Sequence, residues 1–179
     1  MPRAASLGSA FVLVASLSLA TNASGDAPRD ASSVFFIAKS ENRNQVHYGV
    51  HLDSGCVPVG AAPVFVYWRM LEHGPGVTEP LLSREQPGYG IAEQRVVERR
   101  LDGGRILLRL RALPDRQIEI TTAARDGQCD ASATMAIEGA PAALASVFVQ
   151  LRWPFGVDSL LLSGRALSDG HPLRERLAR

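Results

Sequence analysis

The sequence predicts an all-β protein: an antiparallel β-barrel or sandwich of about eight or nine strands with at most one short helix. Along most of the chain, apolar residues alternate with polar ones over short runs, which is the two-residue period of a half-buried strand. Turn signals rich in Gly, Pro, Asn and Asp separate these runs. Consecutive hairpins that close on themselves remove exposed edges, so a barrel is favoured slightly over a sandwich.

Residues 1–23 are predicted to be a secretory signal peptide. A basic start precedes an uncharged run from Ala4 to Ala20, and small residues follow, with cleavage expected after Ala20 or Ala23. The run is short and weakly apolar compared with a spanning helix of about 20 residues. No cysteine follows it that could carry a bacterial lipid anchor. We therefore expect a protein that is periplasmic or secreted and has no membrane span after cleavage.

The mature chain is expected to hold one domain. Residues 24–32 are small and polar without periodicity and indicate a disordered linker, which leaves 33–179 as a single β-rich domain. The formal net charge of the whole chain is +1, and its arginines are scattered rather than clustered. A nucleic-acid partner is therefore not expected.

The first predicted strand is the continuous apolar run 34–38, which is too short for a helix. A polar turn at 40–44 separates it from a second strand at 45–52, whose faces alternate. Val46, Tyr48, Val50 and Leu52 share one face, while His47 and His51 lie on the other. The two strands are expected to pair.

The third predicted strand, 64–71, is apolar on both faces, so it should be covered on both sides. Residues 81–86 allow one short helical turn before Pro87-Gly88. A hairpin with its turn at 102–104 begins a ladder in which Glu119 is expected opposite Arg109 or Arg111. Later strands are predicted near 118–122, 129–137, 144–152 and 157–167.

The chain contains two cysteines, Cys56 and Cys129. An even count in an exported chain is more simply a disulfide than a metal pair or a nucleophile, so we expect these two residues to be joined. In its predicted strand, Cys129 shares a face with Ala133, Met135 and Ile137, which places it on the core side.

Common catalytic and metal motifs are missing from the sequence. His47 and His51 lie about 13 Å apart on a strand at roughly 3.3 Å per residue, too far for one metal ion, and both are expected to face solvent. The mature chain has no serine bracketed by glycines as in a hydrolase elbow, and no glycine-rich phosphate loop. We predict no metal and no cofactor.

Aromatic residues crowd the first half of the domain, and they either form a packed core or line a ligand cavity. Asn42 and Asn44 either close the turn or face a ligand. The residues that would form a cavity are Tyr48, Tyr67 and Trp68, and Glu85 is a carboxylate that folding could bring near the asparagines.

These residues also carry a resemblance. The pattern Ser40-x-Asn42-x-Asn44-x-Val46-x-Tyr48, then Pro63-Val64-x-x-Tyr67-Trp68, Glu79-Pro80-Leu81, Glu85 and Tyr89-Gly90, resembles an uncharacterised bacterial domain of unknown function, DUF4833. The match covers the first third of the mature domain. It adds Tyr89 to the candidate ligand-binding residues and supports the domain boundary, but it implies no activity.

Three functions remain open. The first is a non-enzymatic exported β-domain that binds a small apolar molecule or an envelope partner. The second is a hydrolase or lyase with a polar site near Asn42 and Asn44, and the third is a structural envelope component. An enzyme is the less favoured class, because no recognisable catalytic set accompanies the polar turn.

Overall fold

The computed structural model describes residues 29–72, 74, 77–152 and 156–178, with side chains described from Ser33 onward. The predicted signal peptide and residues 24–28 of the predicted linker lie outside the described residues. β1 begins at Arg29, so it includes the last part of the segment that was predicted as a linker.

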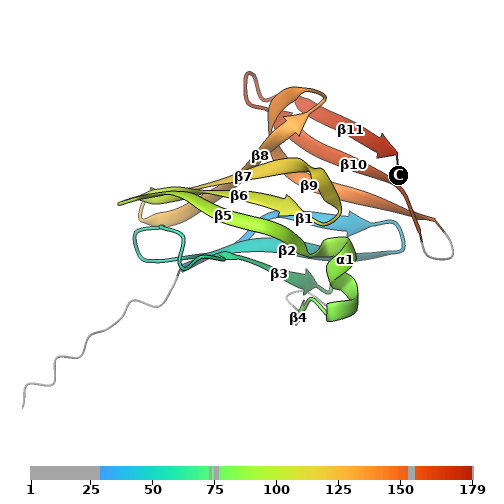
Figure 1. The fold of residues 1–179 in the computed structure, drawn as a ribbon, viewed down its shortest axis with the longest axis horizontal. Coiled ribbons are helices and arrows are strands. Elements are labelled where there is room, and N and C mark those ends of the chain that lie inside the picture. Colours follow the sequence, from blue (N-terminus) through green and yellow to red (C-terminus); the bar gives the residue numbers. More distant parts are fainter. Residues whose placement is uncertain (1–28, 73, 75–76, 153–155, 179) are drawn as a thin grey trace, which may run out of the picture.

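Eleven strands form one sheet, and a short 3-10 helix and α-helix interrupt it between β4 and β5 (Figure 1). The elements are β1 (Arg29–Lys39), β2 (Asn42–Leu52), β3 (Val64–Arg69), β4 (Thr78–Pro80), η1 (Ser83–Glu85), α1 (Gln86–Tyr89), β5 (Ile91–Arg100), β6 (Gly103–Leu110), β7 (Leu113–Arg125), β8 (Gln128–Ile137), β9 (Ala140–Arg152), β10 (Gly156–Ala166) and β11 (Pro172–Ala178).

The sheet folds into two facing layers that share β9. Its order is β4-β3-β2-β1-β9-β8-β7-β6-β5, and β10 pairs with both β9 and β11. The start of β9 pairs with β8, whereas residues 146–149 pair with β1 in parallel. β9 therefore passes from one layer to the other, and Figure 1 shows β5–β7 lying over β1–β3.

The all-β fold class is confirmed. The sheet is not closed into a barrel, however, because no ladder joins its end strands β4 and β5 among the described residues. The preference for a barrel is therefore wrong. Every described strand pair is antiparallel except β1–β9, which brings together segments more than a hundred residues apart and was not expected.

The core lies between the two layers. On β2 the predicted alternation is confirmed, since Val46, Tyr48, Val50 and Leu52 are all fully buried. The facing layer contributes mainly branched aliphatic side chains with under 2% of their surface exposed: Ile106, Leu108, Leu110, Leu113, Ile118, Ile120 and Ile137. Four of these seven are isoleucine, and β-branched side chains pack well on a pleated surface, so they favour the strands they occupy.

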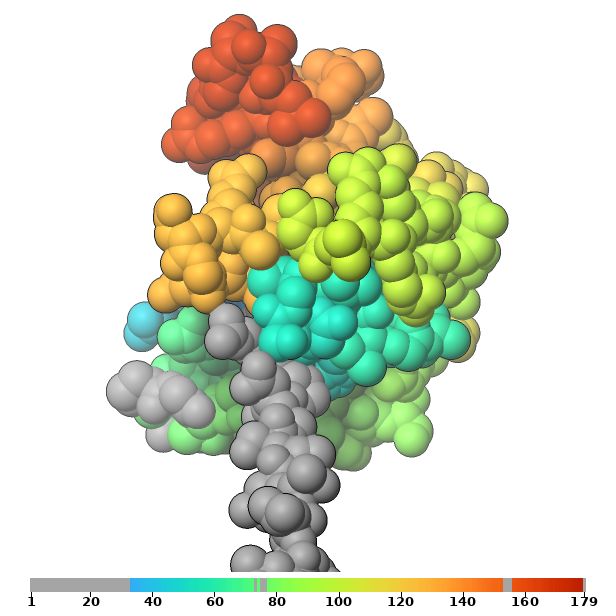
Figure 2. All heavy atoms as spheres, turned by 90° about the vertical axis from the view of Figure 1, so that its left-hand side faces the viewer, coloured from blue at the N-terminus to red at the C-terminus, as the bar shows by residue number. Residues whose placement is uncertain are grey.

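The loop between β2 and β3 closes one end of the molecule. The predicted disulfide is present: Cys56 in this loop is bonded to Cys129 of β8. Arg99 of β5 donates to the Pro58 and Gly60 carbonyls of the same loop. Figure 2 views this end of the molecule and shows the loop between the β5–β6 and β7–β8 turns. Covalent and hydrogen bonds therefore join the two layers here.

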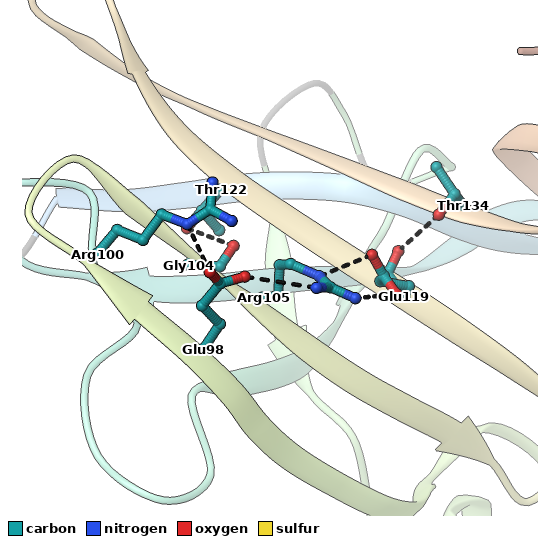
Figure 3. A network of polar contacts seen from close by, with 7 residues as sticks. All are labelled: Glu98, Arg100, Gly104, Arg105, Glu119, Thr122 and Thr134. Atoms are coloured by element: carbon teal, nitrogen blue, oxygen red, sulfur yellow. Dashed lines mark hydrogen bonds and ion pairs between the residues drawn. The ribbon is translucent and has the colours of Figure 1, made fainter.

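The arginine ladder on the outer face of β5–β7 exists, but its register differs from the prediction (Figure 3). Glu119 lies opposite Leu107, and it accepts two hydrogen bonds of 3.0 Å from Arg105 rather than pairing with Arg109 or Arg111. Arg105 also pairs with Glu98 at 3.5 Å, and Arg109 pairs with Glu93. The β6–β7 turn is a tight one at 111–112, so the pairing of β7 with β6 is shifted from the predicted register and Glu119 lies opposite Leu107.

Candidate functional site

Four of the seven candidate ligand-binding residues line one pocket, which we call the polar pocket. Asn42, Asn44, Trp68 and Glu85 surround a volume of about 240 Å³ together with Lys39, Met70, Glu79, Pro80, Leu82 and Arg84. Alternation explains the convergence, since Lys39, Asn44 and Trp68 occupy the inward-facing positions of β1, β2 and β3.

The two asparagines hold the turn as well as lining the pocket. The Asn42 side-chain carbonyl accepts the Asn44 backbone N–H at 3.1 Å, and the Asn44 carbonyl accepts the Glu72 N–H at 3.2 Å. The same turn is tied to β9, because the Ser40 hydroxyl accepts the Leu151 N–H. One oxygen of each amide is thus already used in structural hydrogen bonds, as expected for turn asparagines.

Trp68 and Glu85 form a second structural unit. One carboxylate oxygen of Glu85 accepts hydrogen bonds of 2.9 Å from the Trp68 indole and from the Leu82 N–H. The ammonium of Lys39, the only lysine in the chain, lies 5.2 Å from the centre of the Trp68 ring. That distance is within the range of a cation–π contact. The polar pocket therefore carries two carboxylates and two cations around a nearly buried indole.

Tyr48 and Tyr89 connect the sheet to α1. The Tyr48 ring is fully buried against Phe35, and its hydroxyl donates to the Tyr89 carbonyl at 2.5 Å. The Tyr89 ring meets the Trp68 ring edge to face at 5.4 Å. Tyr48 and Trp68 of the sheet therefore hold η1 and α1 in place through Tyr89 and Glu85, and we call Tyr48, Trp68 and Glu85 the α1 bracket.

Burial and nearby charge keep both tyrosine hydroxyls protonated. Burial raises the pKa of Tyr48 well above its usual range. The pKa of Tyr89 is raised first by burial and then by the negative charges of Glu41 and Glu85. Both hydroxyls therefore stay protonated, because a phenolate would lose hydration in this environment.

Tyr67 lies on the opposite face of β3, away from the other candidates. Its ring stacks on His47 at 5.6 Å, and Phe36 covers the other side of that imidazole at 5.4 Å. His47 is only 4% exposed and contacts the Ser33 hydroxyl at 2.6 Å and the Gln45 amide oxygen at 3.0 Å. The prediction that His47 faces solvent is therefore wrong, because neighbouring rings on the same face of the sheet cover it. His51 is exposed, as expected.

A second and more apolar pocket lies on the other side of the Trp68–Tyr89 contact, and we call it the apolar pocket. Its volume is about 370 Å³. Its walls come from α1, the β6–β7 turn, the start of β7, β9 and β10: Pro87, Gly88, Tyr89, Arg111, Ala112, Pro114, Val149, Leu151, Val157 and Leu160. Tyr89 is the only predicted site residue in this wall.

Sequence reasoning missed this pocket for a clear reason. Its walls come from three stretches of chain, and it forms only because β9 pairs with β1 and β10 while α1 packs on Trp68. Val149 and Leu160 look like ordinary core positions of two strands. The one residue in the sequence that pointed to this pocket was Tyr89, which contacts Trp68 and Tyr48 of the α1 bracket and also lines the apolar pocket.

The described residues contain no helix long and apolar enough to cross a membrane. Within the same residues, no three His, Cys, Asp or Glu side chains gather closely enough to hold a metal ion. The disulfide is compatible with an extracellular or periplasmic location.

No curated protein and no solved structure matches the chain. One family does match, over residues 35–176, and it is described as a domain of unknown function. The matched range runs from β1 to β11 and so includes both layers, the α1 bracket and both pockets. The chain belongs to the DUF4833 family.

Proposed function

We propose that this protein is an exported, non-enzymatic binding domain that holds a small apolar molecule in the apolar pocket. The observation that carries the proposal is a pocket of about 370 Å³ whose described lining residues are apolar apart from Arg111 and the phenol of Tyr89. Pockets of this size and character are typical of small-molecule sites. The predicted signal peptide and the disulfide support the exported location.

The α1 bracket supports binding rather than catalysis. The hydrolase or lyase alternative requires Asn42, Asn44, Tyr48 and Glu85 to act on one substrate. The Tyr48 hydroxyl instead donates to the Tyr89 carbonyl, and Glu85 already accepts two hydrogen bonds. Through these contacts Tyr48 and Glu85 hold α1 in place, and α1 forms one wall of the apolar pocket. A prearranged wall lowers the entropy lost when a ligand binds.

The volume of the pocket indicates how much of a ligand it can enclose. One heavy-atom group takes about 30 Å³, the share of one water molecule in the liquid, so the pocket holds about 12 such groups. A straight chain of about ten carbons with a small head group fits this limit. Until the chain reaches this length, each added methylene that is buried contributes about 0.8 kcal/mol, or about fourfold in affinity.

A series of straight-chain alcohols tests the proposal by isothermal titration calorimetry. From hexanol to decanol we expect the affinity to rise about fourfold per methylene, and beyond about eleven carbons we expect it to stop rising. Affinity that rises steadily through tetradecanol would indicate adsorption on an open surface. No binding at any length would also contradict the proposal.

A matched pair of substitutions locates the site. Val157→Trp places a bulky ring at a half-exposed position of the pocket wall and should abolish decanol binding. Val97→Trp makes the same change on β5 at a valine with similar exposure, 40% against 37%, outside the pocket. It should leave decanol binding unchanged. Circular dichroism checks that both variants fold, and equal decanol affinity in the two would refute the location.

A further inference from the structure

Among the described residues, Arg111 is the only charged one that lines the apolar pocket. It lies in the two-residue turn between β6 and β7, where Leu110 pairs with Leu113. Its backbone N–H donates to the Gly90 carbonyl at 3.0 Å, which ties the turn to the end of α1. Arg111 is exposed, whereas Val149 and Leu160 of the same pocket are buried, so the charged residue lies on the solvent side of the pocket and these apolar residues on its inner side.

The two arginines of the neighbouring strand β6 have acidic partners. Arg105 pairs with Glu119 and Glu98, and Arg109 pairs with Glu93 at 3.6 Å. In the part of the chain that the structure describes, Arg111 pairs with no carboxylate, and β7 offers Pro114 rather than an acid beside it in the pocket wall. Its guanidinium is therefore available to an anion that enters the pocket.

We propose that the ligand of the apolar pocket is a single-chain carboxylic acid of about ten carbons, with its carboxylate on Arg111. This inference rests on the function proposed above and adds the chemical class of the head group. The planar guanidinium offers two parallel N–H donors that match a carboxylate, and such charged hydrogen bonds are stronger than neutral ones. Decanoate has twelve non-hydrogen atoms, which matches the capacity of the pocket.

Calorimetry with three ligands that share one chain tests the head group: decanoate, decanol and decylamine, each below its micelle concentration at pH 7.5. We expect decanoate to bind about tenfold more tightly than decanol, and decylamine to bind more weakly than both. Tenfold is near the lower end for a charged hydrogen bond, because solvent screens the exposed rim.

Variants assign the effect to Arg111. Arg111→Gln should reduce decanoate affinity to that of decanol and leave decanol affinity unchanged. Arg174→Gln makes the same change of charge on β11, outside the pocket, and should alter neither ligand. If Arg111→Gln weakens both ligands equally, Arg111 only shapes the turn and the inference is wrong.

The wild-type results separate this inference from the proposed function. Equal affinities for decanoate and decanol would overturn the carboxylate preference and leave the apolar site standing. Tighter binding of decylamine than of decanoate would overturn it as well. No binding of any of the three would refute the function on which the inference rests.

Discussion

Tyr48→Phe tests whether the α1 bracket holds the wall of the apolar pocket. The substitution deletes one oxygen from a fully buried ring and keeps its stacking on Phe35, whose ring centre lies 4.5 Å away. The Tyr89 carbonyl then loses its 2.5 Å hydrogen bond. A net hydrogen bond contributes about 1 kcal/mol, and an acceptor left buried costs about 1–3 kcal/mol, so we expect a loss of about 2 kcal/mol in unfolding free energy.

Urea unfolding of the oxidised protein, followed by circular dichroism, measures this loss. Tyr48→Leu also removes the ring stacking and leaves a cavity, so it should cost at least about 3 kcal/mol. Because α1 loses an anchor, decanol should bind several-fold more weakly to Tyr48→Phe. A free energy within about 0.5 kcal/mol of the wild type, with unchanged decanol affinity, would refute the bracket.

Further predictions concern the disulfide, the buried histidine and the asparagine turn. Replacing Cys56 and Cys129 by serine opens a link between residues 73 apart in sequence, which should cost about 4 kcal/mol by the chain-entropy estimate; a loss under about 1 kcal/mol in urea unfolding would contradict it. Burial, and then the charge of Arg69, lower the pKa of His47 below its ordinary 6.5, so the unfolded chain binds this proton more readily and stability should fall as pH drops below about 6.5. Urea midpoints at pH 7.5 and 5.0 should differ less in His47→Gln than in the wild type, and an equal difference would exclude His47 as the cause. Asn42→Ala removes the acceptor of the turn and should cost about 1 kcal/mol in thermal unfolding, whereas Asn42→Asp keeps it and should cost less; equal losses would show that the turn hydrogen bond is not the reason.

Local patterns predicted the strands well. The alternation of Val46, Tyr48, Val50 and Leu52 is determined by the two-residue period of a strand, which holds wherever the strand is placed. The register of β1, β2 and β3 then brings Lys39, Asn44 and Trp68 to one face, where they line the polar pocket.

Sequence patterns gave wrong predictions where the exposure or pairing of a residue depends on neighbouring strands. His47 has the spacing of a solvent-facing residue, yet Phe36 and Tyr67 from adjacent strands cover it. Glu119 was expected opposite Arg109 or Arg111, and the tight β6–β7 turn placed it beside Arg105 instead. Register is decided by turn geometry and by the packing of the whole face, which a single strand does not encode.

The sequence by itself determined the β-rich class, the cysteine pair and the inward face of alternating strands such as β2, because these depend on residue type and on a local period. Only the tertiary structure decided that the sheet stays open, that β1 pairs in parallel with β9, and that the walls of the apolar pocket meet. Such contacts join Val149 to Tyr89 and Arg111 across long stretches of chain. They are selected by the burial of apolar surface between whole layers against the entropy of closing long loops, a balance that no local pattern records.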